Sequence, residues 1–498
     1  MDKRQTRQAG NHMTRSLAIL LLWLAVWLPA TQGAGRRSLP VRIRAALSSS
    51  PAARTAYWGI EIADLASGKS LFRLNADHFY LPASNTKIFT TALALARLGP
   101  EYRMHTTVFQ EGRDLVLHGG GDPNLSGRSF PYETGADRGD PLAAIESLAD
   151  QVVAHGVSRV EGNVVGDDSA FVFEPYAEGW SIRDAIGEDG APVSALAVND
   201  NSIELAVAPG AAEGAPARIS WSPSLAVFDV DNEILTDSRV EKRVHVDREP
   251  GSRHMRLWGA VPLFDSGTPR TLAVDDPARF AALALMDALQ RRGVVVNGTA
   301  VARHLYPGAY PIAPPSNSTQ IAERVSPPLL EDLRLTGKLS QNLHAEMILR
   351  LVARERTGVG SRVAGLTELR QFLDEAGIDG EQYNLHDGSG LSRLNVVTPK
   401  AIVSLLRYMG LGPLRENWMS VFAVGGVDGT LSARFNGKRE RGRIQAKTGS
   451  LTHASTLSGY VTRRDGRVLV FSILANNFNG SASEIRGVTD RICSLLLE

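Results

Sequence analysis

The chain has 498 residues, of which 43% are hydrophobic and 21% charged, the composition of a globular protein long enough for two or three domains. A net charge of +1 and no lysine- and arginine-rich run in the body of the chain argue against a nucleic-acid partner. The single cysteine, Cys493, excludes an internal disulfide framework and a cysteine-based zinc site. Its apolar, helix-like surroundings predict a buried thiol.

The N-terminal 34 residues have the pattern of an export signal. Basic residues up to Arg15 precede the apolar run Leu17–Leu28, and small residues follow. This run is shorter than the ~20 residues of a membrane-spanning helix, although an uncleaved anchor stays an alternative because no charge appears until Arg36. Met13 is an alternative start. We predict a signal peptide at 1–34, a periplasmic protein, and membrane association that is at most peripheral.

Two kinds of pattern follow the signal. Residues 57–75 alternate apolar and polar around a glycine-containing turn, as in a β-hairpin, and residues 81–100 have a helical pattern that ends at Gly99-Pro100. From about 105 to 324, short alternating segments separated by Gly, Pro and Asp indicate a β-rich region. Helical patterns return at 329–358, and the C-terminal part predicts three strands and a helix.

We therefore predict an α+β protein whose catalytic domain is split in two. The domain comprises residues 41–104 plus 325–498, and residues 105–324 form one or more inserted β-rich domains. Such nesting is feasible because the ends of an inserted domain usually lie close together.

The first candidate for chemistry is Ser84-Asn85-Thr86-Lys87. Only 8 of the 54 Lys and Arg residues are lysines, and Lys87 alone has a serine three positions before it. Positions i and i+3 share a helical face, so a neutral Lys87 could accept the Ser84 proton, because a buried lysine loses its charge whereas an arginine does not. About half a match is expected by chance, so this pair alone favours the simpler interpretation, Ser84 as an N-cap and Lys87 as a solvated charge in the first turn.

Two further motifs follow along the chain. Lys447-Thr448-Gly449-Ser450 ends an alternating run, and its glycine would let a ligand approach a strand closely; a glycine bulge in an edge strand is the alternative. Ser340-Gln341-Asn342 contains the only serine two positions before an asparagine, and suits a turn between helices, whether catalytic or a local cap.

The order SxxK, SxN, KTG resembles the low-molecular-mass (class C) penicillin-binding proteins of the D-alanyl-D-alanine carboxypeptidase/endopeptidase family. In these proteins a large insert follows the SxxK helix, and here Ser84 and Ser340 are 256 positions apart. The resemblance covers nearly the whole chain after the signal. Further similar stretches are HGGGDPNL (118–125), VEGNVVGDDSAF (160–171), HDGSGLSRLNVVTP (386–399), AVGGVDGTLSARF (423–435) and KTGSLTHASTLSGY (447–460).

The resemblance implies a penicillin-binding (serine β-lactamase/DD-peptidase-like) fold with an antiparallel sheet flanked by helices. It also implies acyl transfer in two steps. Ser84 would attack the penultimate D-alanine and Lys87 would take its proton, being neutral because burial and the charge of Lys447 disfavour its ammonium. The oxyanion would lie between the amides of Ser84 and Ser450. Ser340 would relay a proton to the leaving D-alanine.

The remaining motif residues would bind substrate. Asn342 would hold the peptide backbone, and Lys447, with Thr448, Gly449 and Ser450, the terminal carboxylate. The implied partners are peptidoglycan stem peptides, with β-lactams as covalent inhibitors. The resemblance implies no metal and no cofactor. The chain contains no Glu-x-x-Leu-Asn sequence, the pattern that would indicate a glutamate for deacylation.

Several alternatives stay open. The HDGSGLSR stretch is either a loop that lines the cleft or a glycine-rich turn capped by Asp387, and Asp122 more plausibly serves a turn than catalysis. The same fold could serve an esterase, a D-aminopeptidase or a β-lactamase, or a wall-binding protein without activity. The balance of carboxypeptidase and endopeptidase activity, the third stem residue, the insert's role and the oligomeric state are not determined by the sequence.

Overall fold

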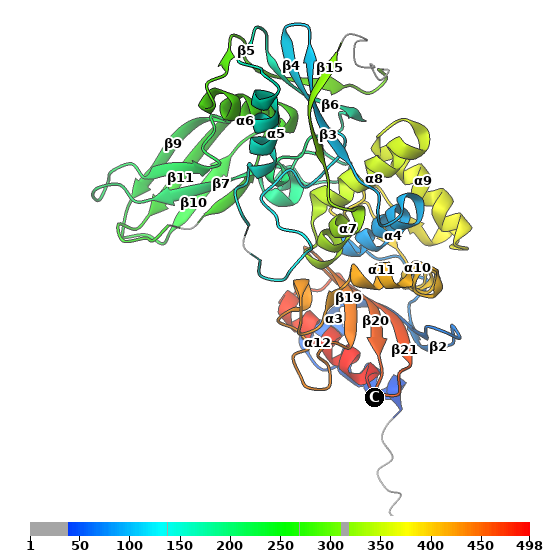
Figure 1. Ribbon diagram of the computed structural model, residues 1–498. Coiled ribbons are helices and arrows are strands. Elements are labelled where there is room, and N and C mark those ends of the chain that lie inside the picture. Colours follow the sequence, from blue (N-terminus) through cyan, green and yellow to red (C-terminus); the bar gives the residue numbers. More distant parts are fainter. Residues whose placement is uncertain (1–37, 137, 268, 310–317) are drawn as a thin grey trace, which may run out of the picture.

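The computed structural model describes residues 38–136, 138–267, 269–309 and 318–498. The predicted signal peptide, residues 1–34, lies outside these residues. No helix in the described part of the chain is long and apolar enough to cross a membrane. Figure 1 shows a lower body that carries both the first and the last elements, and an upper part from which three strands project to one side, β9 (Asp229–Thr236), β10 (Arg243–Asp247) and β11 (His254–Val261).

A six-stranded antiparallel sheet joins the two ends of the chain. Its order is β18-β19-β20-β21-β1-β2, so the N-terminal hairpin pairs with the C-terminal strands through β1 and β21. Strand β20 is buried along nearly its whole length, which explains its continuous apolar and small residues. The strands are β1 (Tyr57–Asp64), β2 (Ser70–Leu74), β18 (Ala423–Val424), β19 (Ile444–Leu451), β20 (Ala454–Thr462) and β21 (Val468–Asn476).

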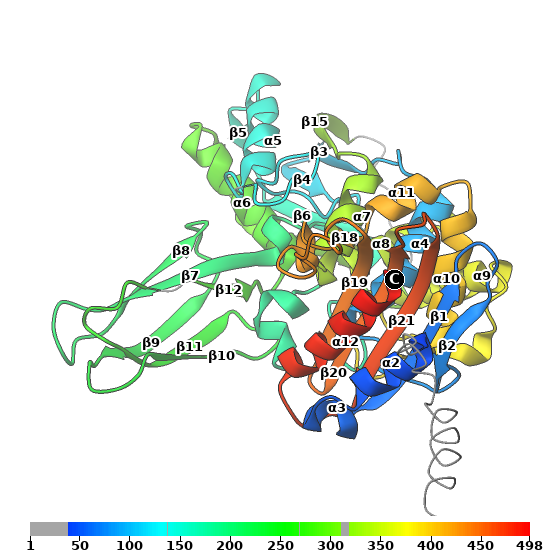
Figure 2. The ribbon, with the colours of Figure 1, turned by 90° about the horizontal axis from the view of Figure 1, so that it is seen from below.

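Helices cover both faces of this sheet. One face packs against α2 (Leu39–Leu47), α3 (Pro51–Thr55) and α12 (Ala482–Leu496), as Figure 2 shows from below. Cys493 is buried in this layer, as predicted. The other face packs against a layer of helices around α4. The sheet and these helices share one apolar core. That layer contains α4 (Thr86–Leu98), α7 (Leu329–Lys338), α8 (Asn342–Thr357), α9 (Arg362–Glu375), α10 (Pro399–Leu411) and α11 (Arg415–Ser420), with the short strands β16 (Tyr383–Asn384) and β17 (Val396–Val397) beside it.

Between α4 and α7 the chain forms a second sheet with its own core. This five-stranded mixed sheet has the order β14-β6-β4-β3-β15, and two helices pack on it through a separate apolar cluster. Its elements are β3 (His105–Glu111), β4 (Asp114–His118), α5 (Ala143–Ala154), β6 (Val164–Val172), α6 (Pro277–Arg291), β14 (Ala300–Leu305) and β15 (Thr319–Val325), with β5 (Arg159–Val160) paired to β13 (Val295–Val296).

Two three-stranded sheets extend this region outward around another small core. They comprise β7 (Ser202–Ala208), β8 (Arg218–Ser222), β9 (Asp229–Thr236), β10 (Arg243–Asp247), β11 (His254–Val261) and β12 (Arg270–Ala273). The strand-rich character expected for 105–324 is present, but helices α5 and α6 were not predicted. Helix α6 starts where the Asp276 side chain accepts from the Arg279 amide and Pro277 takes the first turn. The division at 104/105 and 324/325 stays a prediction.

Candidate active site

The predicted serine–lysine pair lies at the start of α4. Ser84 belongs to a 3₁₀ turn, η1 (Ala83–Asn85), and Lys87 to the first turn of the helix that follows. The Thr456 hydroxyl donates to the Pro82 carbonyl oxygen at 2.9 Å and so fixes this turn against β20. Lys87 Nζ donates to Ser84 Oγ at 3.0 Å. The N-cap of α4 is Asn85, so Ser84 is not the capping residue considered above.

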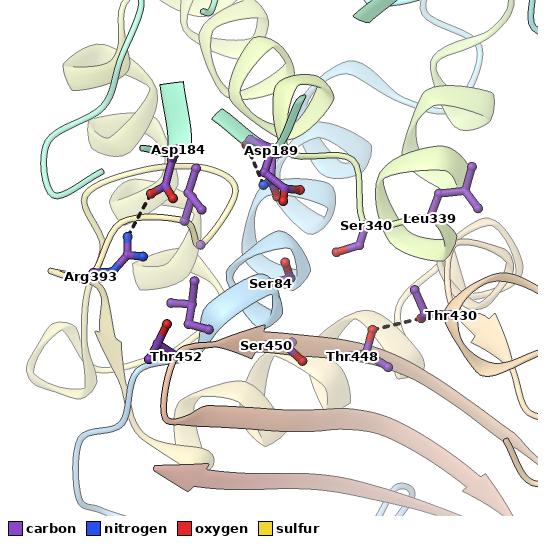
Figure 3. A pocket seen from close by; sticks show the side chains of 15 residues that line it. Ser84, Asp184, Asp189, Leu339, Ser340, Arg393, Thr430, Thr448, Ser450 and Thr452 are labelled. Carbon is purple, nitrogen blue, oxygen red and sulfur yellow. Dashed lines mark hydrogen bonds and ion pairs between the residues drawn. The ribbon is translucent and has the colours of Figure 1, made fainter. Parts of the chain in front are cut away.

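The SxN and KTG motifs meet the pair from two other directions. Ser340 lies between α7 and α8, in the turn expected for it, with a φ of 67°, a conformation that costs free energy in a residue with a side chain. Lys447 Nζ donates to Ser340 Oγ at 2.9 Å and to the Thr448 carbonyl oxygen at 2.8 Å. Figure 3 shows Ser340 pointing toward the space between Ser84 and Thr448.

Asn342 connects the lysine to a segment from the middle of the chain. Its Oδ1 accepts from Lys87 Nζ at 2.6 Å, and its Nδ2 donates to the Asp189 carbonyl oxygen at 2.8 Å. Ser84, Ser340, Asn342 and residues 448–450 line one cleft of about 410 Å³. Both lysines are buried. All eight predicted site residues therefore gather at this cleft, although their roles stay predictions.

The HDGSGLSR stretch lines the cleft and is also held by a capping aspartate, so both interpretations apply. Gly390 and Leu391 are part of the cleft wall. The buried Asp387 accepts from the amides of Gly390 at 2.8 Å and Ser392 at 2.6 Å. The loop thereby places the Ser389 carbonyl oxygen 2.6 Å from Lys87 Nζ. Lys87 thus has three acceptors and a fixed position.

Glu346 on α8 also holds the HDGSGLSR loop in place. Its Oε1 accepts from the amides of Gly388 at 2.9 Å and Ser389 at 2.8 Å, and its Oε2 accepts from Arg350 at 3.0 Å. Asp122, in contrast, lies away from the cleft wall. Its Oδ1 accepts from the Asn124 amide at 2.8 Å, which is the turn role favoured for it.

The charges of the two buried lysines depend on each other. Burial lowers the pKa of Lys87 to about 8, against the opposing influence of Asp387, Glu346 and Asp189. The Lys447 pKa is held well below its ordinary value by burial and then by the charge of Lys87. Because repulsion between two charges is mutual, a charge on either buried amine disfavours a charge on the other.

This cleft brings together a serine held by a buried lysine, a second serine held by a second lysine, and a strand edge with a glycine. A family model described as the D-Ala-D-Ala carboxypeptidase 3 (S13) family matches residues 40–495.

The chain belongs to this family. The D-alanyl-D-alanine carboxypeptidase of Actinomadura sp. (strain R39) is 32% identical over 486 residues, covering 94% of this chain and 86% of that protein. DacB, a D-alanyl-D-alanine carboxypeptidase of Haemophilus influenzae, is 25% identical over 421 residues and 84% of each chain.

Solved structures agree with the fold. Penicillin binding protein 4 of Haemophilus influenzae superposes with a TM-score of 0.78 at 22% identity, covering 91% of this chain and 98% of that one. The same protein complexed with a β-lactam gives a TM-score of 0.75. The predicted family, its α+β penicillin-binding fold and its enzyme class, a serine-type D-Ala-D-Ala carboxypeptidase, are confirmed.

A buried ionic cluster in this family member ties the SxN segment to the middle of the chain. Asp200 Oδ1 accepts from Arg128 Nη1 at 2.5 Å and His344 Nε2 at 3.1 Å, and its Oδ2 accepts from Gln341 Nε2 and Arg138 Nη2, each at 2.9 Å. Burial alone would raise the Asp200 pKa, but the charge of Arg128 and the His344 hydrogen bond hold it well below its ordinary value. Asp200 thus positions the middle residue of the motif.

Sequence reasoning missed several residues of the cleft. Asp184 and Asp189, from the region before β7, line it together with Arg393, whose Nη1 donates to Asp184 Oδ2 at 3.0 Å. Thr430 lines it too and accepts from the Thr448 hydroxyl at 2.9 Å. Arg393 ends the HDGSGLSR stretch, for which lining the cleft was one of the two interpretations. Thr430 falls within the family-like stretch 423–435, which was a usable signal. The two aspartates lie in none of the quoted stretches.

Proposed function

We propose that this carboxypeptidase acts on peptidoglycan stem peptides through an acyl-enzyme on Ser84. The observation that carries the proposal is the hydrogen bond from Lys87 to Ser84 Oγ, formed inside a cleft whose walls are the SxN turn and the KTG strand. A serine needs an adjacent base to become a nucleophile at neutral pH, and Lys87 is the basic group placed for that role.

In acylation, Ser84 Oγ attacks the carbonyl carbon of the penultimate D-alanine while Lys87, in its neutral form, takes the hydroxyl proton. The oxyanion is held by the amides of Ser84 and Ser450. In support of this, a Cβ on Gly449 would come 3.0 Å from the Ser84 nitrogen, so β19 passes close beside that amide. One such donor typically contributes ~10²–10³ in rate.

The leaving D-alanine departs as an amine. Ser340, which accepts from Lys447 Nζ, relays the proton to the departing nitrogen, and Asn342 orients the substrate backbone. The terminal carboxylate binds at Lys447 with the hydroxyls of Thr448 and Ser450. An anion there supplies the counter-charge that keeps Lys447 protonated despite its burial, and this in turn favours the neutral form of Lys87.

Water then hydrolyses the ester of Ser84 and restores the enzyme. Penicillins acylate the same serine, and their slow release makes them covalent inhibitors. Peptidoglycan lies outside the cytoplasmic membrane, which agrees with export through residues 1–34, a periplasmic location and at most peripheral membrane contact. Residues 41–104 plus 325–498 would be the catalytic domain and 105–324 the insert.

An assay with three substrates distinguishes the proposed carboxypeptidase from a β-lactamase and an esterase. The mature protein is assayed with a D-Ala-D-Ala peptide, a simple ester and a chromogenic cephalosporin. We expect the D-Ala-D-Ala peptide to have the highest kcat/KM of the three substrates, measured as release of D-alanine. The reason is that this peptide occupies both the carboxylate site and the rest of the cleft. Preferential, fast hydrolysis of the cephalosporin would instead indicate a β-lactamase, and preference for the ester an esterase.

A further inference from the structure

A second cavity adjoins the catalytic cleft across the edge of β19. It also measures about 410 Å³, and it shares Thr430 and residues 448–450 with the cleft. Its remaining walls come from α12, from β20 and from the loop residues Ala433 and Arg434. A volume of this size is that of a ligand pocket, and no role assigned above to the active site uses it.

The alternation of β19 explains why the two cavities share one strand. Gly449 faces the catalytic serine, since a Cβ on it would approach the Ser84 nitrogen. Thr448 and Ser450, one residue to either side, alternate with Gly449, and both line the second cavity as well as the cleft. Thr448 pairs with Leu457, and Ser450 pairs with Ser455 of β20, and both partners line the second cavity. The residues whose hydroxyls are expected to bind a terminal carboxylate thus lie where the two cavities meet.

Arg486 supplies an uncompensated positive charge to this cavity. The cavity has two arginines on its wall, but Arg434 is paired with Asp490. Arg486 is exposed on α12, and within the described parts of the chain its guanidinium has no hydrogen-bond or ion-pair partner. A free guanidinium in a pocket rimmed by hydroxyls suits a carboxylate.

We propose that the second cavity is the subsite for the leaving peptide when the substrate is a cross-link between two stem peptides. This inference rests on the proposed function. A single terminal D-alanine ends at the Thr448 and Ser450 hydroxyls and needs no space beyond them. The leaving group of a cross-link continues past that point as a second stem peptide with carboxylates of its own, and Arg486 binds one of them.

The chemical step is that of the carboxypeptidase reaction. Ser84 Oγ forms an ester with the D-alanyl carbonyl carbon, and the amide bond to the side-chain amine of the second stem breaks. The leaving nitrogen gains the proton that Ser84 lost, through Lys87 and Ser340. The second peptide departs with a free amine, and water then hydrolyses the ester.

The test compares two substrates with Arg486→Ala, and with Arg491→Ala as the matched control. Arg491 is an exposed arginine on the same helix that does not line the cavity. The substrates are a purified cross-linked stem-peptide dimer and the monomeric pentapeptide. For Arg486→Ala we expect kcat/KM on the dimer to fall about tenfold, as for loss of one charge-assisted hydrogen bond, and that on the pentapeptide to stay within twofold. Arg486→Glu should reduce dimer cleavage further, and Arg491→Ala should change neither rate.

The outcomes separate the inference from the proposed function. Equal losses on both substrates, or an unchanged rate on the dimer, would overturn the subsite. A wild-type protein that cleaves the pentapeptide but not the dimer would overturn it as well. If the wild type leaves the pentapeptide intact, the proposed function itself fails.

Discussion

Replacing Lys87 with methionine is expected to slow acylation of Ser84 by penicillin about 10²–10⁴-fold, the usual contribution of a general base. Methionine keeps the length of the side chain but removes the amine that we propose accepts the Ser84 proton. Lys87 is buried and makes hydrogen bonds to Ser84, Asn342 and the Ser389 carbonyl oxygen, and no other lysine in the described part of the chain donates to Ser84. The rate is measured as the second-order constant for penicillin labelling.

The pH dependence of this rate follows from the direction of the Lys87 pKa shift. Burial lowers that pKa to about 8, so the amine is mostly protonated below pH 8 and becomes an effective base as the pH rises. Acylation by the wild type should therefore increase about tenfold per unit of pH below 8 and level off above it. The methionine variant should lack this inflection.

Lys400→Met is the control for the lysine experiment. Lys400 is partly exposed and paired with Asp77, away from the cleft, so its loss should leave both the rate and the pH profile unchanged. A Lys87→Met protein that acylates at the wild-type rate, or that keeps the same inflection near pH 8, would show that another group is the base.

Replacing Asp200 with asparagine is expected to lower the free energy of unfolding by about 3–5 kcal/mol, the cost of leaving a buried charge without its partner. The substitution keeps the shape of the side chain, but Arg128 stays buried. Because Asp200 also holds Gln341, the SxN turn should loosen and penicillin acylation should fall too. Urea unfolding followed by tryptophan fluorescence measures the first effect, and penicillin labelling the second.

The matched control is Asp237→Asn, since Asp237 also accepts from one arginine through both oxygens, Arg239, but on the surface. It should change neither stability nor acylation. The Asp200 contribution is complete above its ordinary pKa of ~4 and is lost as the pH falls through the lower folded value, so both proteins are compared at neutral pH. Wild-type stability in Asp200→Asn would contradict the structural role of this carboxylate.

The positions of the site residues were predictable because these residues belong to short motifs. The spacing of Ser84 and Lys87 predicted their contact, although Ser84 lies in a 3₁₀ turn ahead of the helix. Ser340 was expected in a turn, and its φ of 67° shows how tight that turn is. In each case neighbouring residues in sequence determine the local geometry.

The parts of the structure that could not be predicted depend on contacts between residues far apart in the sequence. Asp200 meets Arg128 and His344 only because the chain between α4 and α7 folds back against α8, and no local pattern encodes that meeting. Helix α6 was missed because its alanine-rich, buried sequence follows a long series of strands.

The central claim is that Ser84 is the acylated nucleophile. Intact-protein mass spectrometry of the mature protein with a penicillin, beside Ser84→Ala, tests it most directly. We predict one adduct per wild-type molecule and none on the folded variant. An adduct that persists in Ser84→Ala, or no adduct on folded wild type, would contradict the assignment of this cleft.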